Sequence, residues 1–585
     1  MNRHERRAAA REAKKAPSGS GASNSARLCE FGRQHLQAGR LLDAQLCCRQ
    51  ALAADPDFAE ALHLMGLVSL QGGQFDHAIE WIARADRQAP GADYLLTLAL
   101  ALEQQGRFAE ALKSYQRLIE REPHHLEAAH RCGFLLLSRL GRAADALAYL
   151  DLCDRLHPNH ASVLDHRSQA LLELRRPAEA LTDGLAAHAL NPANADICNN
   201  IGVALQLLQR EDEALAWFDK AVALRQGFAK AVANKAFTLT QIQRFDEALA
   251  AFGQAKAIDP SDAGAELNCA QLHLLTGNFE AGWAGREARW RSHAGLVSYP
   301  KFSQPVWRGD VDVSGKTILV YEDEGFGDTI QFARYVPMLA ARGARVILVV
   351  GDALHPLLSR LPGVARCLPK SSKVLPAFDM HCPACSLPLA FATRLDTIPA
   401  AMSYLPAPAT GHIQAWEARL SDRLGPHDRL RVGLVWSGRP THMNDHNRSI
   451  PLEMLSRLLD PGAAFVSLQK DPRPIDRTVL ADGRLVDLTG HLADFADTAA
   501  LASCLDLVIT VDTSVAHLAG ALGRPAWVML PYTPDWRWLL GRDDSPWYPT
   551  LRLFRQGASR NWEDVLERVW TELAARVAAF RAAQT

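Results

Sequence analysis

A carboxylate in a glycine-rich turn is the first candidate for chemistry. The stretch EGFGDTIQFARY, residues 324–335, follows an apolar run and leads into an amphipathic one, so it is predicted to join a strand to a helix. It departs from a phosphate-binding G-x-G-x-x-G turn, because Ile330 replaces the third glycine and Asp328 would repel an anion at the helix start. We therefore expect the turn to aim Asp328 into a cleft, where it could accept a proton from a hydroxyl nucleophile. The alternative is that Asp328 only caps the helix.

A second turn, in the stretch LVITVDTSVAHLAGALGRP (507–525), suits an anion better. The free N–H groups at the start of its predicted helix, with hydroxyl groups beside them, could bind a diphosphate. The residues of this predicted site are Asp512, Thr513, Ser514, Val515 and His517. Arg448, in the stretch DHNRSIPLEML, could add a positive charge to the same phosphate. Taken alone, His517 is more typical of a core or capping residue than of a ligand.

Both turns lie in a part of the chain where strand-like and helical runs alternate. After about residue 292 the runs KTILVYEDE, TIQFARYVPMLAARG and RVILVV follow one another, and the same texture restarts at LRVGLVWSG. This pattern predicts two α/β domains with parallel sheets, separated by a proline-rich stretch at residues 397–411. Ligands of such sheets bind beyond the carboxyl ends of the strands, so two domains that face each other form a cleft.

The first half of the chain has a different organisation, with a period of about 34 residues. Prolines at positions 56, 90, 123, 158, 192 and 260 are spaced by 33 to 35 residues or by twice 34, and an alanine lies 12 residues before each. A repeat of this length indicates stacked pairs of helices, in which the small residue marks their close approach and the proline stops the second helix. The pattern resembles the tetratricopeptide repeat over residues 25–290, and such arrays usually bind proteins on a concave face.

One column of the array carries amides. Asn200, Asn234 and Asn268 are 34 residues apart, so they share one position on the first helix of three successive repeats. An amide both donates and accepts hydrogen bonds and could grip a peptide backbone without reading its sequence. The alternative is that these side chains only bond between helices.

Composition limits the function classes. The chain has 585 residues, of which 48% are hydrophobic and 22% are charged, and its formal net charge is -1, which is typical of a globular protein without an obvious polyanionic partner such as nucleic acid. The eleven cysteines show no secreted-type framework, so reduced thiols in the cytoplasm are expected. The first 24 residues are basic and then Gly/Ser-rich, which predicts a disordered tail, and we expect no transmembrane segment.

The second half of the chain resembles a GT-B glycosyltransferase of the heptosyltransferase-like kind (family 9), and the whole chain resembles bacterial proteins that join such a domain to tetratricopeptide repeats. The stretches that carry the resemblance are EGFGDTIQFARYVP, HCPACSLPLAF, VGLVWSG, DHNRSIPL, DLTGHLADFADTAAL, VDTSVAHLAGALGRP and PDWRWLLGRDDSPWYPTLRLFRQ. O-GlcNAc transferases have a similar architecture and hold protein substrates on an Asn ladder, which supports a peptide site at Asn200, Asn234 and Asn268.

The resemblance also implies roles for the site residues. Asp328 corresponds to the base for the acceptor hydroxyl, Asp512 lies near the donor sugar, and the residues after it hold the diphosphate. Arg448 stands where heptosyltransferases usually carry Lys. The nucleobase is expected near Ser467, Gln469 and Lys470. A helix N-terminus with Arg448 could stabilise the leaving diphosphate without a metal, so no cofactor is expected.

The predicted fold is therefore an α-solenoid followed by two Rossmann-like domains. The predicted segments are a disordered tail (1–24), the repeats (25–290), a linker (291–315), an acceptor domain (316–411), a nucleotide-sugar domain (412–555) and a terminal helix that crosses to the first domain (556–585). The leading hypothesis is a cytoplasmic, metal-independent, inverting transferase that modifies a protein held by the repeats. The alternatives are an enzyme acting on lipopolysaccharide or another glycan, and a repeat scaffold with a degenerate, non-catalytic transferase domain.

Overall fold

The computed structural model describes residues 21–292, 301–442, 444–459 and 462–584. The density of internal contacts divides the chain into two compact units, one up to residue 234 and one from residue 235 onward, so that the boundary falls within helix α14 (Ala229–Gln241). Each unit is described by itself below. Within the described residues, no helix combines the length and the apolar composition that a bilayer crossing requires.

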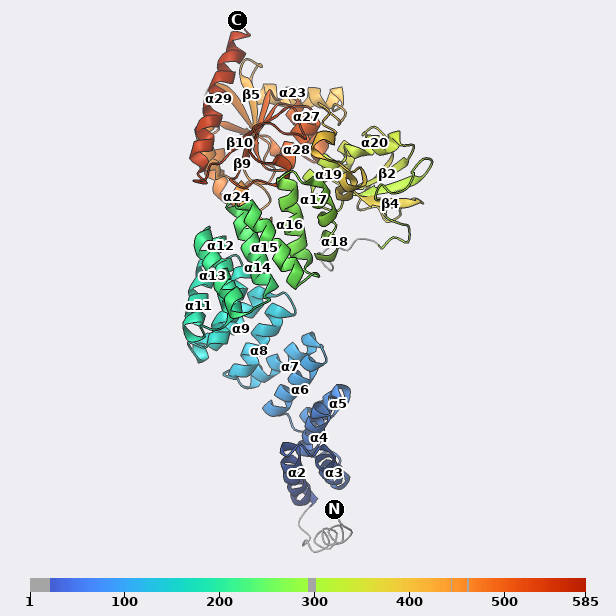
Figure 1. Ribbon diagram of the computed structural model, residues 1–585, viewed down its shortest axis with the longest axis vertical. Helices are drawn as coiled ribbons and strands as arrows, with labels where there is room; N and C mark the ends of the chain where they lie inside the picture. The colour runs from blue at the N-terminus through green and yellow to red at the C-terminus, as the bar shows by residue number, and fades with distance from the viewer. Residues whose placement is uncertain (1–20, 293–300, 443, 460–461, 585) are drawn as a thin grey trace. The chain divides into compact units, whose positions relative to one another are not determined.

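The first unit is a series of helical hairpins, in which each helix packs on the next along the chain (Figure 1). Its complete helices are α2 (Gly21–Gln37), α3 (Leu41–Ala54), α4 (Ala59–Gln71), α5 (Phe75–Gln88), α6 (Ala92–Gln104), α7 (Phe108–Arg121), α8 (Leu126–Ser138), α9 (Ala143–Leu156), α10 (Ala161–Glu173), α11 (Pro177–Leu190), α12 (Ala195–Leu207) and α13 (Glu211–Leu224).

Small side chains explain why these helices pair closely. The repeated alanines, such as Ala78 and Ala214, are fully buried. A Cβ atom on Gly66 would lie 2.3 Å from Cγ1 of Ile82, so a larger residue would force that pair of helices apart. The helical repeat that the 34-residue period predicts is confirmed.

The second unit begins with the rest of the repeats. Its helices are α15 (Phe245–Ile258), α16 (Ala263–Leu275), α17 (Phe279–Arg286) and α18 (Arg289–Ser292). The indole Nε1 of Trp283, on α17, donates to the backbone oxygen of Thr393 at 2.8 Å. The side-chain hydroxyl of Thr533 donates to the backbone oxygen of Gln241 at 2.9 Å. The end of the array is thus bonded to both α/β domains that follow it.

Two parallel sheets form the α/β part of this unit, as the sequence predicts. The first has the strand order β3-β2-β1-β4 and the second has the order β10-β9-β8-β5-β6-β7, with parallel pairing in every ladder. The strands are β1 (Thr317–Tyr321), β2 (Arg345–Val350), β3 (Val364–Pro369), β4 (Met380–Pro383), β5 (Leu430–Val435), β6 (Ala463–Ser467), β7 (Leu485–Asp487), β8 (Leu507–Val511), β9 (Ala526–Leu530) and β10 (Leu551–Arg555). Both sheets are consistent with a GT-B fold, which confirms the predicted fold class.

Helices connect these strands. In the first domain they are α19 (Phe326–Phe332), α20 (Tyr335–Ala341), α21 (His355–Leu358), η1 (Ala384–Ser386), α22 (Leu387–Ala390) and η2 (Leu395–Thr397). In the second they are α23 (Thr410–Leu424), α24 (Asp445–Arg448), α25 (Leu452–Leu455), η3 (Ser456–Leu458), η4 (Pro474–Asp476), α26 (Arg477–Leu480), η5 (Thr489–His491), α27 (Phe495–Ser503), α28 (Ser514–Ala521), η6 (Trp536–Trp538) and α29 (Trp562–Ala582).

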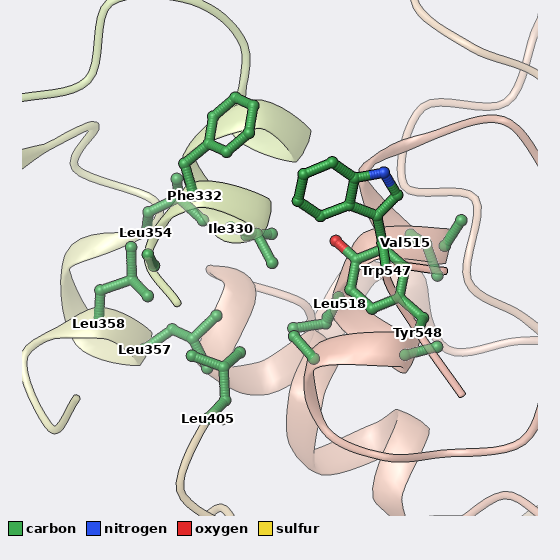
Figure 2. Packing of buried hydrophobic residues seen from close by; sticks show 14 of the residues in the cluster. Ile330, Phe332, Leu354, Leu357, Leu358, Leu405, Val515, Leu518, Trp547 and Tyr548 are labelled. Atoms are coloured by element: carbon green, nitrogen blue, oxygen red, sulfur yellow. The ribbon is translucent and has the colours of Figure 1, made fainter. Parts of the chain in front are cut away.

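One apolar core joins the two domains and the repeat end. Figure 2 shows Ile330 and Phe332 of α19 packed in the same cluster as Val515 and Leu518 of α28. Trp536, Trp538, Trp547 and Tyr548 are at most 3% exposed and belong to this core. Because these aromatic rings are buried in the shared core, they pack the two domains together.

The terminal helix corrects one expectation. The sequence analysis expected it to cross to the first domain, but α29 packs against β10 and η3 of the second domain. Its buried residues Val565, Val569 and Leu573 share a core with strands of the second sheet. Trp570 of the same helix is 45% exposed and lies outside this core. The helix therefore covers the sheet that it directly follows in the chain.

Candidate active site

The two turns that the sequence singled out lie against each other. Helix α19, which begins after the Gly325 turn, packs on α28, which begins after strand β8. A Cβ atom on Gly327 would lie 2.8 Å from Cδ2 of His517 and 3.5 Å from Cα of Ser514. Because only a glycine leaves room for this approach, the start of α19 in the first domain directly faces the start of α28 in the second.

Asp328 lies between the domains with both carboxylate oxygens engaged. Oδ2 accepts the backbone N–H of Gly325 at 3.0 Å, so Asp328 does cap α19, and Oδ1 accepts a hydrogen bond from Nη2 of Arg537. The side chain remains 19% exposed. Burial raises the pKa of Asp328 to about 6, against the opposing effect of Arg537. Each oxygen of a carboxylate has two acceptor sites, so these two bonds leave Asp328 able to accept a proton.

Two arginines at the end of the repeats contact Glu324, which lies in the same turn as Asp328. Arg286, from repeat helix α17, donates to Glu324 at 2.6 Å, and Arg289 lies 3.8 Å from the same carboxylate. Burial alone would raise the pKa of Glu324, but the two guanidinium groups outweigh it and lower the pKa to about 2. Glu324 therefore stays ionised, and its negative charge helps to raise the pKa of Asp328.

The same region contains one trio with the spacing of metal ligands. Among the described residues, only Glu324, Asp328 and Cys385 bring three such ligand atoms within 4.8 Å of one another. Arg286 and Arg537 already pair with the two carboxylates. Burial raises the pKa of the Cys385 thiol well above its usual range, so the thiol is not a ready metal ligand. The trio therefore fits a charge-balanced network better than a cation site.

The donor side is built from the first turn of α28 and from Arg448. The first N–H groups of this helix have no intrahelical acceptor, and Thr513 and Ser514 beside them are partly exposed. Nη1 of Arg448 donates to the backbone oxygen of Asp512 at 2.9 Å, so the loop after β5 meets the loop after β8. Burial and the nearby Asp535 raise the pKa of Asp512 to about 6. The predicted phosphate residues Asp512, Thr513, Ser514, Val515, His517 and Arg448 thus come together in one place.

His517 is a buried residue of this site. It is 4% exposed, its Nδ1 lies 2.9 Å from the hydroxyl oxygen of Tyr548, and its ring stacks on Trp538. Burial lowers the pKa of His517 to about 3, so the ring is neutral at neutral pH. Val515 is also buried. The side chains of both residues therefore support the helix, whose start supplies backbone N–H groups.

The residues predicted to bind a nucleobase lie at the end of β6. The hydroxyl of Ser467 accepts the N–H of Gln469 at 3.2 Å. Oε1 of Gln469 accepts the N–H groups of Trp436 and Ser437, so both side chains are used within the fold. Lys470 is exposed, and its ammonium group donates to the backbone oxygen of Ala493. Of the three, Lys470 is the side chain most accessible to a ligand.

The three asparagines lie on first helices of repeats, as the period requires. Nδ2 of Asn200 donates to Asp165 at 3.0 Å, and Nδ2 of Asn234 donates to Asn199 at 2.9 Å, so both amides bond between repeats of the first unit. Asn268 is half-buried on α16 in the second unit. The bonds of Asn200 and Asn234 follow the alternative stated above, that the asparagine side chains bond between helices.

Sequence reasoning did not assign a role to Arg286 or Arg537. Both bind carboxylates of the 324–328 turn, but they are 38 and 209 residues from their partners along the chain. Arg537 lies in the stretch PDWRWLLGRDDSPWYPTLRLFRQ, which carries part of the family resemblance, and Arg286 lies next to the aromatic end of the repeats. In the sequence, each of these arginines is marked only by the aromatic residues beside it. Such a pattern does not show which carboxylate the arginine binds.

Comparison with known families agrees with this architecture. A model described as "Glycosyltransferase family 9 (heptosyltransferase)" matches residues 469–539, which include the start of α28 and Arg537. Models described as "Tetratricopeptide repeat" match residues 96–161 and 194–226, and one described as "Anaphase-promoting complex, cyclosome, subunit 3" matches residues 38–118. The chain joins a tetratricopeptide-repeat region to a C-terminal glycosyltransferase family 9 domain. The family 9 match indicates a glycosyltransferase domain in this part of the chain.

Individual relatives cover parts of the chain. "Protein FlbA" of Caulobacter vibrioides is 28% identical over 329 residues, which are 52% of this chain and 54% of FlbA, so the chain spans about half the length of this relative. A solved tetratricopeptide repeat protein from Parabacteroides merdae is 15% identical and covers 42% of this chain and 98% of its own, with a TM-score of 0.33. PilF of Pseudomonas aeruginosa is 20% identical and covers 36% and 97%, with a TM-score of 0.32. These low TM-scores add nothing to the assignment.

Proposed function

We propose that this protein transfers a sugar from a nucleoside-diphosphate sugar to a hydroxyl group of a protein held by the repeats. One observation carries the proposal. The turn that bears Asp328 and the N-terminus of α28 face each other across a contact that needs Gly327, because a Cβ atom there would lie 2.8 Å from Cδ2 of His517. A general base on one wall and a diphosphate site on the other are what a direct displacement needs.

In this mechanism the sugar leaves from the diphosphate and the acceptor hydroxyl attacks its anomeric carbon. Asp328 takes the proton of that hydroxyl as the new bond forms. The first turn of α28 and the guanidinium of Arg448 stabilise the negative charge that develops on the diphosphate. Direct displacement inverts the anomeric configuration. The proposal needs no metal, because arginine and helix N–H groups supply the positive charge.

The protein acceptor is supported by the repeats and by the position of their last helices. Asn268 lies on α16, and α16 packs against η6, the element that carries Arg537. The repeats therefore end at the proposed site itself. A protein acceptor is preferred to lipopolysaccharide or another glycan because helical repeats commonly bind proteins and these repeats end beside the proposed site.

One observation favours the non-catalytic alternative. Both oxygens of Asp328 are already bonded, to Gly325 and to Arg537, as they would be in a domain that retains the fold and has lost its reaction. Incubation of the full chain with UDP-glucose, ADP-glucose and GDP-mannose separates the two functions. We expect slow hydrolysis of at least one donor, and inversion at its anomeric carbon by NMR. Binding without hydrolysis or transfer would favour the scaffold.

A further inference from the structure

Arg537 is a residue of the second domain that contacts the base side of the site. It lies on η6, its side chain is 9% exposed, and its guanidinium lies 4.2 Å from the centroid of the Trp536 ring. Nε donates to Oε1 of Gln331 at 2.6 Å, Nη1 donates to Asp535 at 2.7 Å, and Nη2 donates to Asp328. One guanidinium therefore holds two residues of α19 from the opposite domain.

The guanidinium is not exhausted by these bonds. It carries five N–H groups, and the three bonds use one on each nitrogen, so Nη1 and Nη2 each retain a second hydrogen. Trp538, the residue after Arg537 on η6, stacks on His517 of α28 with ring centroids 5.5 Å apart, and Arg537 lowers the pKa of both His517 and Asp512. The same side chain thus contacts the base and lies close to the helix N-terminus proposed to bind the diphosphate.

Charge balance explains why such a residue is needed. Besides burial, Asp535 raises the pKa of both Asp328 and Asp512, and Glu324 raises that of Asp328, so carboxylates on the two walls repel one another. Arg286 is paired with Glu324, on the repeat side. Arg448 and Arg537 are the two cations that lower the pKa of Asp512 on the donor side, and Arg334 also acts on His517. Loss of Arg537 would therefore leave a bound dianion closer to an excess of negative charge.

We infer that Arg537 is a positioning residue that fixes Asp328 toward the acceptor hydroxyl and binds the donor diphosphate with its remaining N–H groups. This inference rests on the proposed function. The donor site would then have two arginines that bind the diphosphate, Arg448 and Arg537. Donor binding and the orientation of Asp328 would both depend on the side chain of Arg537. A simple tie between domains would hold Asp328 without affecting the donor.

The test uses the full chain with Arg537→Gln and Arg537→Lys, and with Arg484→Gln as a control, because Arg484 is an exposed arginine that pairs with Asp482. The probe is whichever of UDP-glucose, ADP-glucose and GDP-mannose binds the wild type most tightly. Calorimetry gives its Kd, and hydrolysis between pH 5 and 8 gives the pH dependence of kcat/KM. For Arg537→Gln we expect Kd to rise at least about tenfold, since a charge-assisted bond is lost. We also expect the acid limb of the kcat/KM profile, where activity falls at low pH, to move up by about one pH unit, because Asp328 loses its positively charged neighbour.

Arg537→Lys should keep the acid limb near that of the wild type, because it keeps the charge, and should raise Kd by about threefold or more because it lacks the planar fork. An unchanged Kd, or an unchanged acid limb, in folded Arg537→Gln would overturn the inference and leave the proposed function intact. If Arg537→Gln does not fold, a wild-type Kd in Arg537→Lys overturns it. Failure of the wild type to bind any of the three donors would instead overturn the proposed function, and this inference with it.

Discussion

A methyl group at position 327 would lie 2.8 Å from Cδ2 of His517, closer than carbon atoms approach each other without displacement. His517 has little freedom to move, because it is bonded to Tyr548 and stacked on Trp538. The contact between the two domains at the proposed site therefore depends on the absence of a side chain at Gly327.

Gly327→Ala should loosen this contact. We expect the variant to lose about 1–3 kcal/mol of stability through overpacking, and to hydrolyse the donor more slowly because the two walls move apart. Urea unfolding and donor hydrolysis measure the two effects. Gly253→Ala is the matched control, since a Cβ atom there meets nothing within 4 Å and alanine favours the helix α15 that contains it. Equal stability of Gly327→Ala and the wild type would show that the domains do not depend on this approach.

Trp283 gives the repeats a structural role in the transferase. Its indole is 2% exposed, donates to Thr393, and contacts the rings of Phe332 and Trp536. Trp283→Ala should cost about 3–5 kcal/mol, because it leaves a cavity where the repeat end meets both domains. Thermal and urea unfolding of the full chain test this. Trp570→Ala, at a tryptophan that is 45% exposed, should change stability by much less. Similar losses in the two variants would contradict this role of the repeat end.

His517 should make the fold sensitive to acid. Its pKa is near 6.5 in the unfolded chain and about 3 in the folded one, because burial disfavours the charged ring. The unfolded state thus binds a proton below pH 6.5 that the folded state does not bind, and stability falls as the pH drops from 6.5 towards 3. At pH 5 this group alone costs about 2 kcal/mol.

The difference in unfolding free energy between the wild type and His517→Gln isolates this contribution from those of other buried groups. We expect the difference to change by about 2 kcal/mol between pH 7 and pH 5, with the wild type losing more. His491→Gln, at an exposed histidine, serves as the control. A difference that does not vary with pH would mean that His517 is charged or solvated in the folded protein.

The asparagine column separates a protein acceptor from other acceptors. Replacing Asn200, Asn234 and Asn268 together with Ala should reduce the transfer of radiolabelled sugar to proteins of a cell lysate at least about tenfold, since each lost hydrogen bond weakens peptide binding. Donor hydrolysis should be unchanged, because none of the three residues belongs to the proposed donor site. A control triple at the exposed amides Gln50, Gln88 and Gln254 should transfer normally. Undiminished protein labelling by the asparagine triple would remove the column from acceptor binding.

Local patterns made most of the fold predictable. The 34-residue period fixed the helical hairpins, and the apolar runs that end in turns located strands β1, β5 and β8. The turns that carry Asp328 and Asp512 could be found in the sequence because the residues of each candidate site lie within a few positions of one another. Asp512, for example, lies two residues before the start of α28. The helical hairpins, the strands and the two turns could be predicted because each depends only on residues close together in the chain.

Partners that are distant in the chain were not predictable. The pairing of Arg537 with Asp328 joins residues 209 positions apart, and neither stretch specifies the other. The covering of the second sheet by α29 was likewise not evident from its apolar stripe, because a stripe shows which face is buried and not which sheet buries it. Tertiary packing decides both features.

The central claim is that Asp328 is the base, and Asp328→Asn tests it most directly. With the tightest-binding of the three donors, wild-type activity should fall as the pH drops below about 6, because Asp328 then binds a proton and cannot accept another. Asp328→Asn should reduce the rate by about 10²–10⁴-fold and keep the donor Kd within a few fold. A variant that hydrolyses the donor and transfers its sugar at the wild-type rate, with the same acid limb, would contradict the account.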